Sequence, residues 1–348
     1  MISLTHLIEK LQREHCLRKE EYLRLLTERT PEIQALLAQK ARACCEETYG
    51  NGIFIRGLIE FSNYCKNNCY YCGLRCENGN ISRYRLTEEE ILSCCEEGYQ
   101  LGFRTFVLQG GEDPYFTHQR MADLVQNIKK AFPQCAITLS VGEQSRETYA
   151  LWRKAGADRY LLRHETADEN HYRLLHPQSM SMARRKQCLW DLKDLGYQVG
   201  AGMMVGSPHQ TMEHLAEDLC FLQELKPHMV GIGPFIPQKD TPFGAESAGS
   251  VDLTLYLLSI IRLMLPKVLL PATTALATLH EQGREQGILA GANVCMPNLT
   301  PQTHRAQYAI YDRKLSSHGE SAQNLNEIKK QMEAMGFTIL ESRGDYPQ

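Results

Sequence analysis

Eight short runs of β-branched and apolar residues, separated by amphipathic segments, dominate the chain between residues 51 and 311. Most of the intervening segments are charge-rich and about 12–20 residues long, which is typical of repeated strand–helix units. Eight such units predict an α/β fold, a closed (β/α)8 barrel of the TIM type, and the 348 residues are enough for one such barrel with extensions. The expected strands are Ile53–Phe61, Thr105–Gln109, Ala136–Val141, Arg159–Arg163, Gln198–Val205, Met229–Phe235, Leu269–Thr274 and Asn293–Met296.

The two ends of the chain have a different pattern of apolar residues, which predicts helices rather than strand–helix units. From Leu4 to Glu46 apolar residues recur at helical spacing, and Pro31 stands where a first helical turn tolerates proline. We expect residues 1–50 to form a helical N-terminal cap, residues 51–311 the barrel, and residues 312–348 a C-terminal extension that contains a helix from Leu325 to Met335.

Charge and hydropathy argue against two classes of partner. The 38 Lys and Arg residues and 41 Asp and Glu residues give a net charge of −3, which provides no attraction to nucleic acid or to anionic lipid. The most apolar stretch, from Leu253 to Ala272, is interrupted by Arg262, Pro266 and Lys267 and does not resemble a membrane span. Glu9 and Lys10 interrupt the start of the chain where a signal peptide needs an apolar run, so we expect a cytoplasmic protein.

Three cysteines lie close together after the first expected strand, in the order Cys65-x3-Cys69-x2-Cys72. Three thiolates on one tight loop suit a [4Fe–4S] cluster with one iron left open for chemistry. Zinc is the alternative, but no second Cys or His pair follows at zinc-site spacing. Cys76 is a further alternative, because it would close the cluster for electron transfer; its spacing departs from the ferredoxin run, and we expect three protein ligands.

Polar groups follow most of the other expected strands, at the barrel end where active sites form. They include Gln109-Gly-Gly-Glu112, Thr138 with Ser140, Arg163-His-Glu165, Thr273-Thr274 and Met296-Pro-Asn298. The sequence therefore predicts one site that gathers these groups around the cysteine loop.

The cysteine spacing, with Tyr71 just before the third cysteine, resembles the signature of the radical-SAM superfamily. The resemblance implies that the open iron binds S-adenosylmethionine, and that one electron from the cluster yields a 5′-deoxyadenosyl radical inside a shielded barrel. It also implies a glycine-rich element for the amino group of the cofactor, and acidic and basic partners for its polar ends. The cofactor-binding residues implied here are Tyr71, Gly110, Gly111, Glu112, Ser140, Arg163, Glu165, Arg184 and Met296.

Longer strings resemble one family within that superfamily, the HydE maturases of [FeFe]-hydrogenase. They are Ile59-Glu-Phe-Ser-Asn63, Gly111-Glu-Asp-Pro114, Asp158-Arg-Tyr-Leu-Leu-Arg-His-Glu-Thr-Ala167, Gly231-Ile-Gly-Pro-Phe-Ile-Pro237 and Pro271-Ala-Thr-Thr-Ala275. The resemblance implies a small-molecule or organometallic substrate, a sulfur-bearing iron–carbonyl–cyanide species. It also implies an electron donor such as ferredoxin or flavodoxin, and the maturases HydG and HydF as partners. The substrate-binding residues implied are Gln109, Thr138, Arg159, Thr273, Thr274, Tyr308 and Tyr311.

The sequence also departs from this family, and relatives of other activity stay open. Many members carry a second cluster after the eighth barrel unit, but this chain has no cysteine beyond Cys295, so we expect one [4Fe–4S] cluster. Some members place serine where Gly110 stands. A methylornithine synthase-like mutase would need groups for an amino acid. A biotin synthase-like enzyme would need a second cluster, for which Cys135, Cys188 and Cys220 are the candidates. A non-enzymatic electron carrier would use Cys76.

Overall fold

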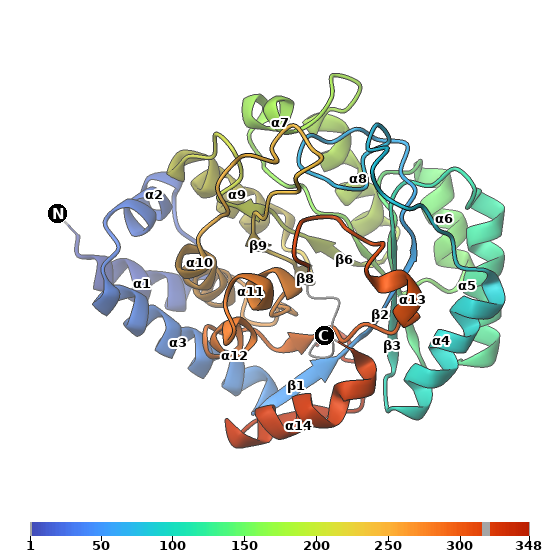
Figure 1. The fold of residues 1–348 in the computed structure, drawn as a ribbon. Coiled ribbons are helices and arrows are strands. Elements are labelled where there is room, and N and C mark those ends of the chain that lie inside the picture. The colour runs from blue at the N-terminus through green and yellow to red at the C-terminus, as the bar shows by residue number, and fades with distance from the viewer. Residues whose placement is uncertain (1, 315–320, 348) are drawn as a thin grey trace.

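The computed structural model describes residues 2–314 and 321–347. Met1 of the predicted cap, and residues 315–320 and 348 of the predicted extension, lie outside the described residues. Within the described ranges the buried apolar runs of the sequence form parallel strands, and the amphipathic segments between them form helices that cover the strands (Figure 1).

The strands close into a barrel, which confirms the predicted α/β class. Strands β2, β3, β4, β5, β6 and β8 form one parallel sheet in that order, and β1 pairs with β10. Isolated bridges from Met229 to Leu269 and from Pro271 to Val294 join β8 to β10 through the seventh predicted strand and complete the ring. The strand bounds are β1 Gly52–Ile55, β2 Gly57–Ser62, β3 Thr105–Gly110, β4 Ala136–Ser140, β5 Arg159–Leu161, β6 Gln198–Ala201, β7 Met204–Val205, β8 Met229–Val230, β9 Gly233–Pro234, β10 Val294–Cys295 and β11 Thr338–Leu340.

Several predicted strands are shorter or interrupted in the structure. The first breaks at Arg56, because β1 pairs with β10 and β11 whereas β2 pairs with β3. The fifth and sixth break at glycine, between β6 and β7 and between β8 and β9. The seventh is reduced to single bridges, since Pro271 lacks an N–H and a helix begins at Thr274.

The predicted N-terminal region consists of three helices that pack on one flank of the barrel. Ser3 and Thr30 accept hydrogen bonds from the first turns of α1 and α3, and Pro31 occupies the first turn of α3 as predicted. In Figure 1 these helices lie beside α9 and α10, opposite α4 to α6. The helix bounds are α1 Leu4–Glu14, α2 Lys19–Thr27, α3 Pro31–Tyr49, α4 Glu88–Gln100, α5 His118–Ala131, α6 Arg146–Ala155, α7 Glu169–Leu175, α8 Met182–Asp194, α9 Met212–Leu225, α10 Val251–Met264, α11 Thr274–Leu279, α12 Gly283–Leu289, α13 Gln302–Arg305 and α14 Leu325–Ala334.

Strand β11 follows α14 and has no counterpart in the sequence analysis. It pairs in parallel with β1, so that β1 lies between β10 and β11. The chain then continues as residues 341–347, which we call the floor segment because its backbone and side chains contact the first residues of β3, β5 and β6.

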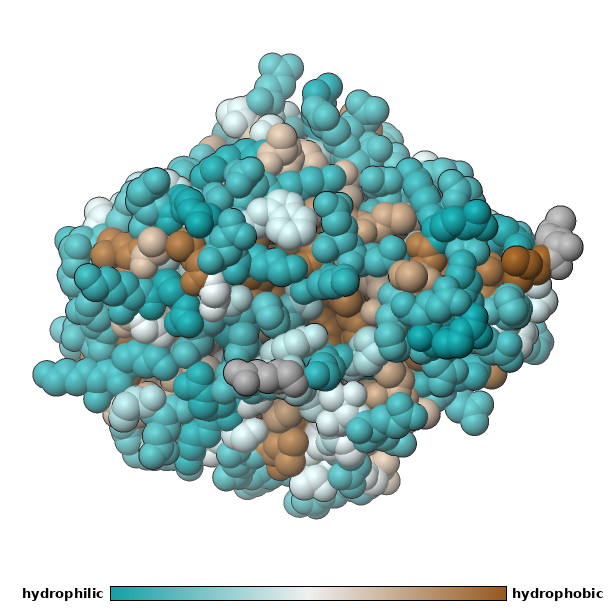
Figure 2. Space-filling model, turned by 180° about the vertical axis from the view of Figure 1, so that it is seen from behind, coloured by the Kyte–Doolittle hydropathy of each residue, from teal (hydrophilic) through white to brown (hydrophobic). Residues whose placement is uncertain are grey.

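The surface of the molecule is mainly hydrophilic on the face seen in Figure 2, with hydrophobic side chains scattered across it. Among the described residues, no helix has the length and apolar character needed to span a bilayer. The stretch from Leu253 to Met264 is a buried helix of the barrel wall, as the interrupted hydropathy pattern indicated.

Candidate functional site

The loop that carries the three cysteines, residues 63–87, follows β2 at the carboxyl end of the barrel strands. The Arg83 guanidinium donates hydrogen bonds to four carbonyl oxygens of this loop, those of Asn63, Leu74, Arg75 and Asn78, at 2.5–3.1 Å. One fixed, planar cation therefore holds the turns that follow Cys72.

Backbone hydrogen bonds join the same loop to three other parts of the barrel. The amides of Lys66, Tyr70 and Gly73 donate to the carbonyl oxygens of Glu112, Leu175 and Ile310, at 2.9–3.0 Å. Because the partners belong to different βα units, the cysteines occupy a position that the whole barrel rim determines.

Cys65, Cys69 and Cys72 are half-buried free thiols, whereas Cys76 is exposed. Burial raises the pKa of Cys72 to about 12 and raises the pKa of Cys69 well above its usual value. The thiolate charges of neighbouring cysteines add to both shifts. A bound cation of high charge is the partner that makes such thiols ionise, as iron does in a cluster.

The predicted Gly110-Gly111-Glu112 element packs directly against the cysteine loop. A Cβ atom on Gly111 would lie 2.2 Å from the Tyr64 carbonyl oxygen and 2.6 Å from Cys65 Cβ, so only glycine allows this approach. The buried Glu112 carboxylate accepts a hydrogen bond from the amide of Glu143 at 2.8 Å and pairs with Lys66 at 3.1 Å. Glu112 thus connects the loops that follow β2, β3 and β4.

A cavity of about 340 Å³ lies inside the barrel, next to Cys72. Its wall contains residues from nearly all of the strand ends, as the rim pattern predicted. The predicted site residues on this wall are Tyr71, Cys72, Gln109, Thr138, Arg163, Glu165, Thr273, Thr274, Met296 and Tyr311.

Arg163 and Glu165 follow β5 and form an ion pair at 3.1 Å on the cavity wall. Glu165 has a φ of 66°, a left-handed conformation that costs a non-glycine residue of order 1 kcal/mol. Its amide donates to the Gly202 carbonyl oxygen at 3.0 Å, and the Met204 amide donates to the Glu165 carbonyl oxygen at 3.2 Å. Contacts with the β6–β7 loop therefore hold this carboxylate toward the cavity.

The structure places Arg184 and Arg185 differently. Arg184 is exposed on α8, donates to the Gln144 carbonyl oxygen and does not line the cavity. Arg185 is buried, pairs with Glu143 at 2.5 Å, and its charge acts on the thiol of Cys69. Arg184 stays a prediction for the cofactor site, and Arg185 is a cation near the cysteines that the sequence analysis did not select.

The structure places Arg159 away from the cavity in which it was predicted to bind substrate. Its guanidinium lies at the first residue of β5, where it bonds Thr105, Gln198, the Arg343 carbonyl oxygen and Asp345. It does not line the cavity, so the structure does not support the predicted direct contact with substrate. The physical reason is its position: a residue that begins a barrel strand lies at the end opposite the active site.

The other predicted residues lie close to the cavity without lining it. Ser140 pairs in register with Gln109 at the ends of β4 and β3. Tyr308 is buried beside Gln109, and Lys314 lies over its ring at 4.7 Å from the centroid.

Two charged features of the cavity were missed by the sequence analysis. Arg56, at the break between β1 and β2, is buried and lines the cavity end nearest the strand starts, which we call the cavity floor. Glu60, on β2, and Lys314 form a largely buried ion pair on the cavity wall, where Asn298 also donates to Glu60 at 2.9 Å. A charged residue within an apolar strand run, as Arg56 is, was the signal in the sequence that could have revealed the floor.

Several buried polar atoms of this wall have no hydrogen-bond partner among the described residues. They are Nε and one terminal nitrogen of Arg56, Nε of Arg163, Oε2 of Glu165, and the hydroxyl oxygens of Thr138 and Thr273. Unpaired buried donors are costly in an empty apolar cavity, so their convergence is typical of a binding site for a polar ligand.

Comparison with known proteins decides the family. Residues 59–222 match the sequence profile of the Radical SAM superfamily. The chain is 44% identical over 332 residues to the [FeFe] hydrogenase maturase subunit HydE of Thermotoga maritima, covering 95% of this chain and 94% of that protein. The chain belongs to the radical SAM superfamily and is HydE-like. A 3-methylornithine synthase of Methanosarcina acetivorans is 32% identical over 299 residues, which cover 85% of this chain and 83% of that enzyme.

Solved structures of this superfamily share the fold. The crystal structure of methylornithine synthase (PylB) superposes with a TM-score of 0.82 at 30% identity, covering 96% of this chain and 97% of that one. The structure of HydG, a maturase of the [FeFe]-hydrogenase, superposes with a TM-score of 0.83 at 22% identity, covering 97% and 76%. At that identity the likeness to HydG shows the fold alone.

The protein is therefore a radical-SAM enzyme, whose cofactors are a [4Fe–4S] cluster and S-adenosylmethionine. The residues present fit both groups. Cys65, Cys69 and Cys72 supply three soft ligands from one loop. Glu165 and Arg163 present a carboxylate and a guanidinium on the wall of the cavity, and these groups suit the ammonium, ribose and carboxylate groups of such a cofactor.

Proposed function

We propose that this HydE-like enzyme performs a radical step in the maturation of [FeFe]-hydrogenase, on a sulfur-bearing iron–carbonyl–cyanide species. The identity to HydE over almost the whole chain supports the assignment. The observation that supports this class of substrate is the balance of charges on the cavity wall.

Among the residues that the structure describes, five charged side chains line the cavity, and four of them form ion pairs. Glu60 binds Lys314, and Glu165 binds Arg163. Arg56 remains at the floor, where one terminal nitrogen lies 2.9 Å from the Met229 sulfur. An uncompensated guanidinium with two unpaired nitrogens favours an anionic ligand, and cyanide ligands of a metal complex accept hydrogen bonds.

The hydroxyls of Thr138 and Thr273 point to the same type of ligand. Both oxygens are buried without a partner among the described residues, and both residues line the cavity. In this proposal the two hydroxyls and Arg56 orient the substrate at the floor, while Arg163 and Glu165 orient the cofactor at the mouth.

When bound and reduced, the cluster and its cofactor supply the 5′-deoxyadenosyl radical. The chain contributes orientation and exclusion of water. Apolar side chains such as Leu58, Val107, Leu161 and Ile310 complete the cavity wall and shield the reacting atoms.

Methylornithine synthase activity is the second candidate, because the PylB structure matches over almost the entire chain. A lysine substrate has a carboxylate that Arg56 could bind, but it also carries two ammonium groups that would need free carboxylates in the cavity. In the part of the chain that the structure describes, the two carboxylates that line the cavity, Glu60 and Glu165, are both in ion pairs, so neither is free for an ammonium group. The cavity therefore favours the maturase assignment.

The partners of this reaction follow from the same proposal. HydG would provide the substrate, HydF would receive the product, and ferredoxin or flavodoxin would reduce the cluster.

The test begins with anaerobic reconstitution of the cluster. Electron paramagnetic resonance of the reduced protein, with and without S-adenosylmethionine, reports on an open iron, and 5′-deoxyadenosine reports on cleavage. Addition of the HydG product should then stimulate cleavage in the parent protein but not in Arg56→Gln. Stimulation by lysine instead, with methylornithine formed, would replace the maturase assignment by the mutase.

A further inference from the structure

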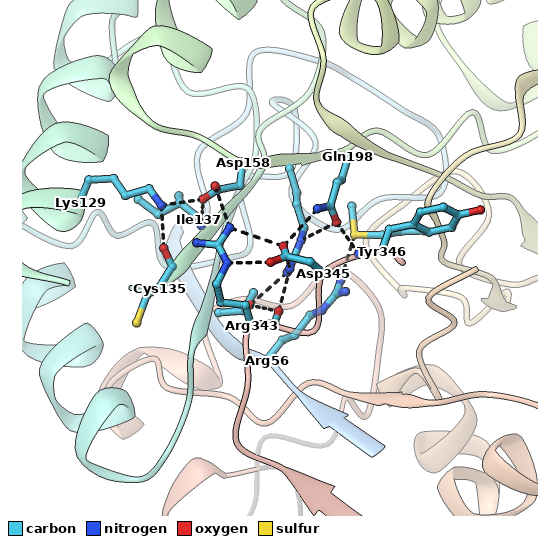
Figure 3. A network of polar contacts seen from close by, with 12 residues as sticks. Arg56, Lys129, Cys135, Ile137, Asp158, Gln198, Arg343, Asp345 and Tyr346 are labelled. Carbon is cyan, nitrogen blue, oxygen red and sulfur yellow. Dashed lines mark hydrogen bonds and ion pairs between the residues drawn. The ribbon is translucent and has the colours of Figure 1, made fainter. Parts of the chain in front are cut away.

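The floor segment seals the end of the barrel beneath Arg56. The Arg343 carbonyl oxygen accepts hydrogen bonds from Thr105 Oγ1 at 2.8 Å and from Arg159 at 2.7 Å. The Tyr346 amide donates to Gln198 Oε1 at 3.1 Å. Figure 3 shows the segment crossing between the starts of these strands.

Asp345 is the centre of this contact. One carboxylate oxygen accepts hydrogen bonds from Arg159 at 2.7 Å and from Gln198 at 3.1 Å, and the other accepts from Arg343 at 2.8 Å (Figure 3). Arg159 has no exposed surface, whereas Asp345 is 40% exposed. A buried cation thus receives its counter-charge from a carboxylate outside the barrel wall.

Cations outnumber carboxylates around this floor. Arg343 and Lys129 share Asp158, at 3.0 and 2.9 Å, while Arg159 and Arg343 share Asp345. Arg56 lies near enough to Arg159 and Asp345 to be affected by both charges. After burial itself, the charge of Arg159 lowers the pKa of Arg56, and that of Asp345 raises it.

We propose that Asp345 limits the affinity of the cavity floor for anions, by neutralising Arg159 beneath the cation Arg56. Asp345 is a positioning residue here, because it acts through arginines and does not line the cavity. This inference rests on the proposed function in one respect: it takes the anion bound at the floor to be part of the substrate.

The sign of the effect separates this role from a merely structural one. Without the Asp345 charge, two adjacent buried guanidinium groups lack compensation, and a small anion that enters the cavity interacts with both. Asp345→Asn should therefore bind anions more tightly, although loss of the ion pair destabilises the protein. Arg343→Gln should have the opposite effect, since it leaves Asp158 and Asp345 with one cation fewer.

The experiment measures bromide binding to the reconstituted, cluster-bearing protein without turnover, by line broadening in bromide magnetic resonance. We expect Asp345→Asn to bind bromide about five-fold more tightly than the parent and Arg343→Gln to bind it more weakly. Glu341→Gln is the matched control: it adds the same charge change in the same segment, but Glu341 pairs with Lys329 on the surface, and bromide affinity should not change.

Tighter binding in Asp345→Asn together with weaker binding in Arg343→Gln supports the inference, and any other combination overturns it. If Asp345→Asn does not fold, Arg343→Gln decides alone, with equal or tighter binding as the contrary result. Bromide binding requires no radical chemistry. This inference can therefore fail while the maturase assignment holds, and the maturase assignment can fail while this inference holds.

Discussion

Asp218 Oδ1 lies 3.2 Å from His164 Nε2, and neither side chain has any exposed surface. The same carboxylate accepts the amide hydrogen of Ala167, and His164 Nδ1 accepts the amide hydrogen of Gly202. Burial lowers the pKa of His164 to about 3, so the ring is neutral, and its proton lies on Nε2 because Nδ1 accepts from Gly202. A neutral histidine and a buried carboxyl from α9 thus hold the turn that contains Glu165.

We expect Asp218→Ala to lower the free energy of unfolding by roughly 1–3 kcal/mol, because it leaves the buried amide of Ala167 without an acceptor. It should also weaken binding of S-adenosylmethionine, since the turn of Glu165 loses its support. Urea denaturation and isothermal calorimetry check the two effects. Asp218→Asn keeps an acceptor for Ala167 and should lose less stability; equal stability of the alanine variant and the parent would contradict the role.

Replacement of the cysteines separates three-ligand from four-ligand binding. Cys69→Ser should abolish cofactor cleavage, because it removes a half-buried ligand of the loop. Cys76→Ser should leave cleavage largely intact, since Cys76 is exposed and its amide is bonded to Asn67. Iron content and the paramagnetic spectrum are the measurements, and an equal loss of cluster in the two variants would show that four cysteines bind it.

The approach of Gly111 to the cysteine loop gives a steric prediction. Gly111→Ala should displace Cys65 and lower the free energy of unfolding by roughly 2 kcal/mol or more, because its Cβ would overlap backbone atoms. Gly79→Ala is a suitable control in the same loop, since nothing lies within 4 Å of a Cβ there. Iron content after reconstitution and thermal unfolding measure both variants; a Gly111→Ala protein with full iron content would show that the loop can shift.

Asp345 should also make stability depend on acid. Burial acts to raise its pKa, but the hydrogen bonds from Arg343 and the charge of Arg159 prevail and lower it to about 2, from 3.8. Its contribution is therefore complete above about pH 4 and is lost as the pH falls toward 2. Because Asp345 is 40% exposed, we expect only about 1 kcal/mol between parent and Asp345→Asn at neutral pH. Urea unfolding from pH 7 to pH 2 should show this difference vanish, and a constant difference would contradict the ion pair.

Local spacing predicted the parts of the site that lie within one loop. The three cysteines follow one another closely in the sequence, as do the residues of the glycine element, and the ends of the expected strands supplied most of the cavity wall. The barrel was predictable for the same reason, since each strand–helix unit repeats one pattern.

The direction of each strand decides which arginine can reach the active site, and the sequence analysis did not apply it to Arg159. Arg159 begins β5 and Arg163 follows it, so the two guanidinium groups belong to opposite ends of the barrel. The sequence contained this signal. The pairing of Asp345 with Arg159 was not predictable, because it joins distant segments without a repeated pattern.

Strand β1 obtains its two neighbours very late in the order of synthesis. Phe54 pairs with Val294 on one side and with Leu340 on the other, and both partners follow it by most of the chain. During translation β1 therefore presents two open edges, which is the condition that favours association between chains. Production of this protein should accordingly benefit from slow synthesis or from chaperones that cover β1 until residues 294 and 340 have emerged.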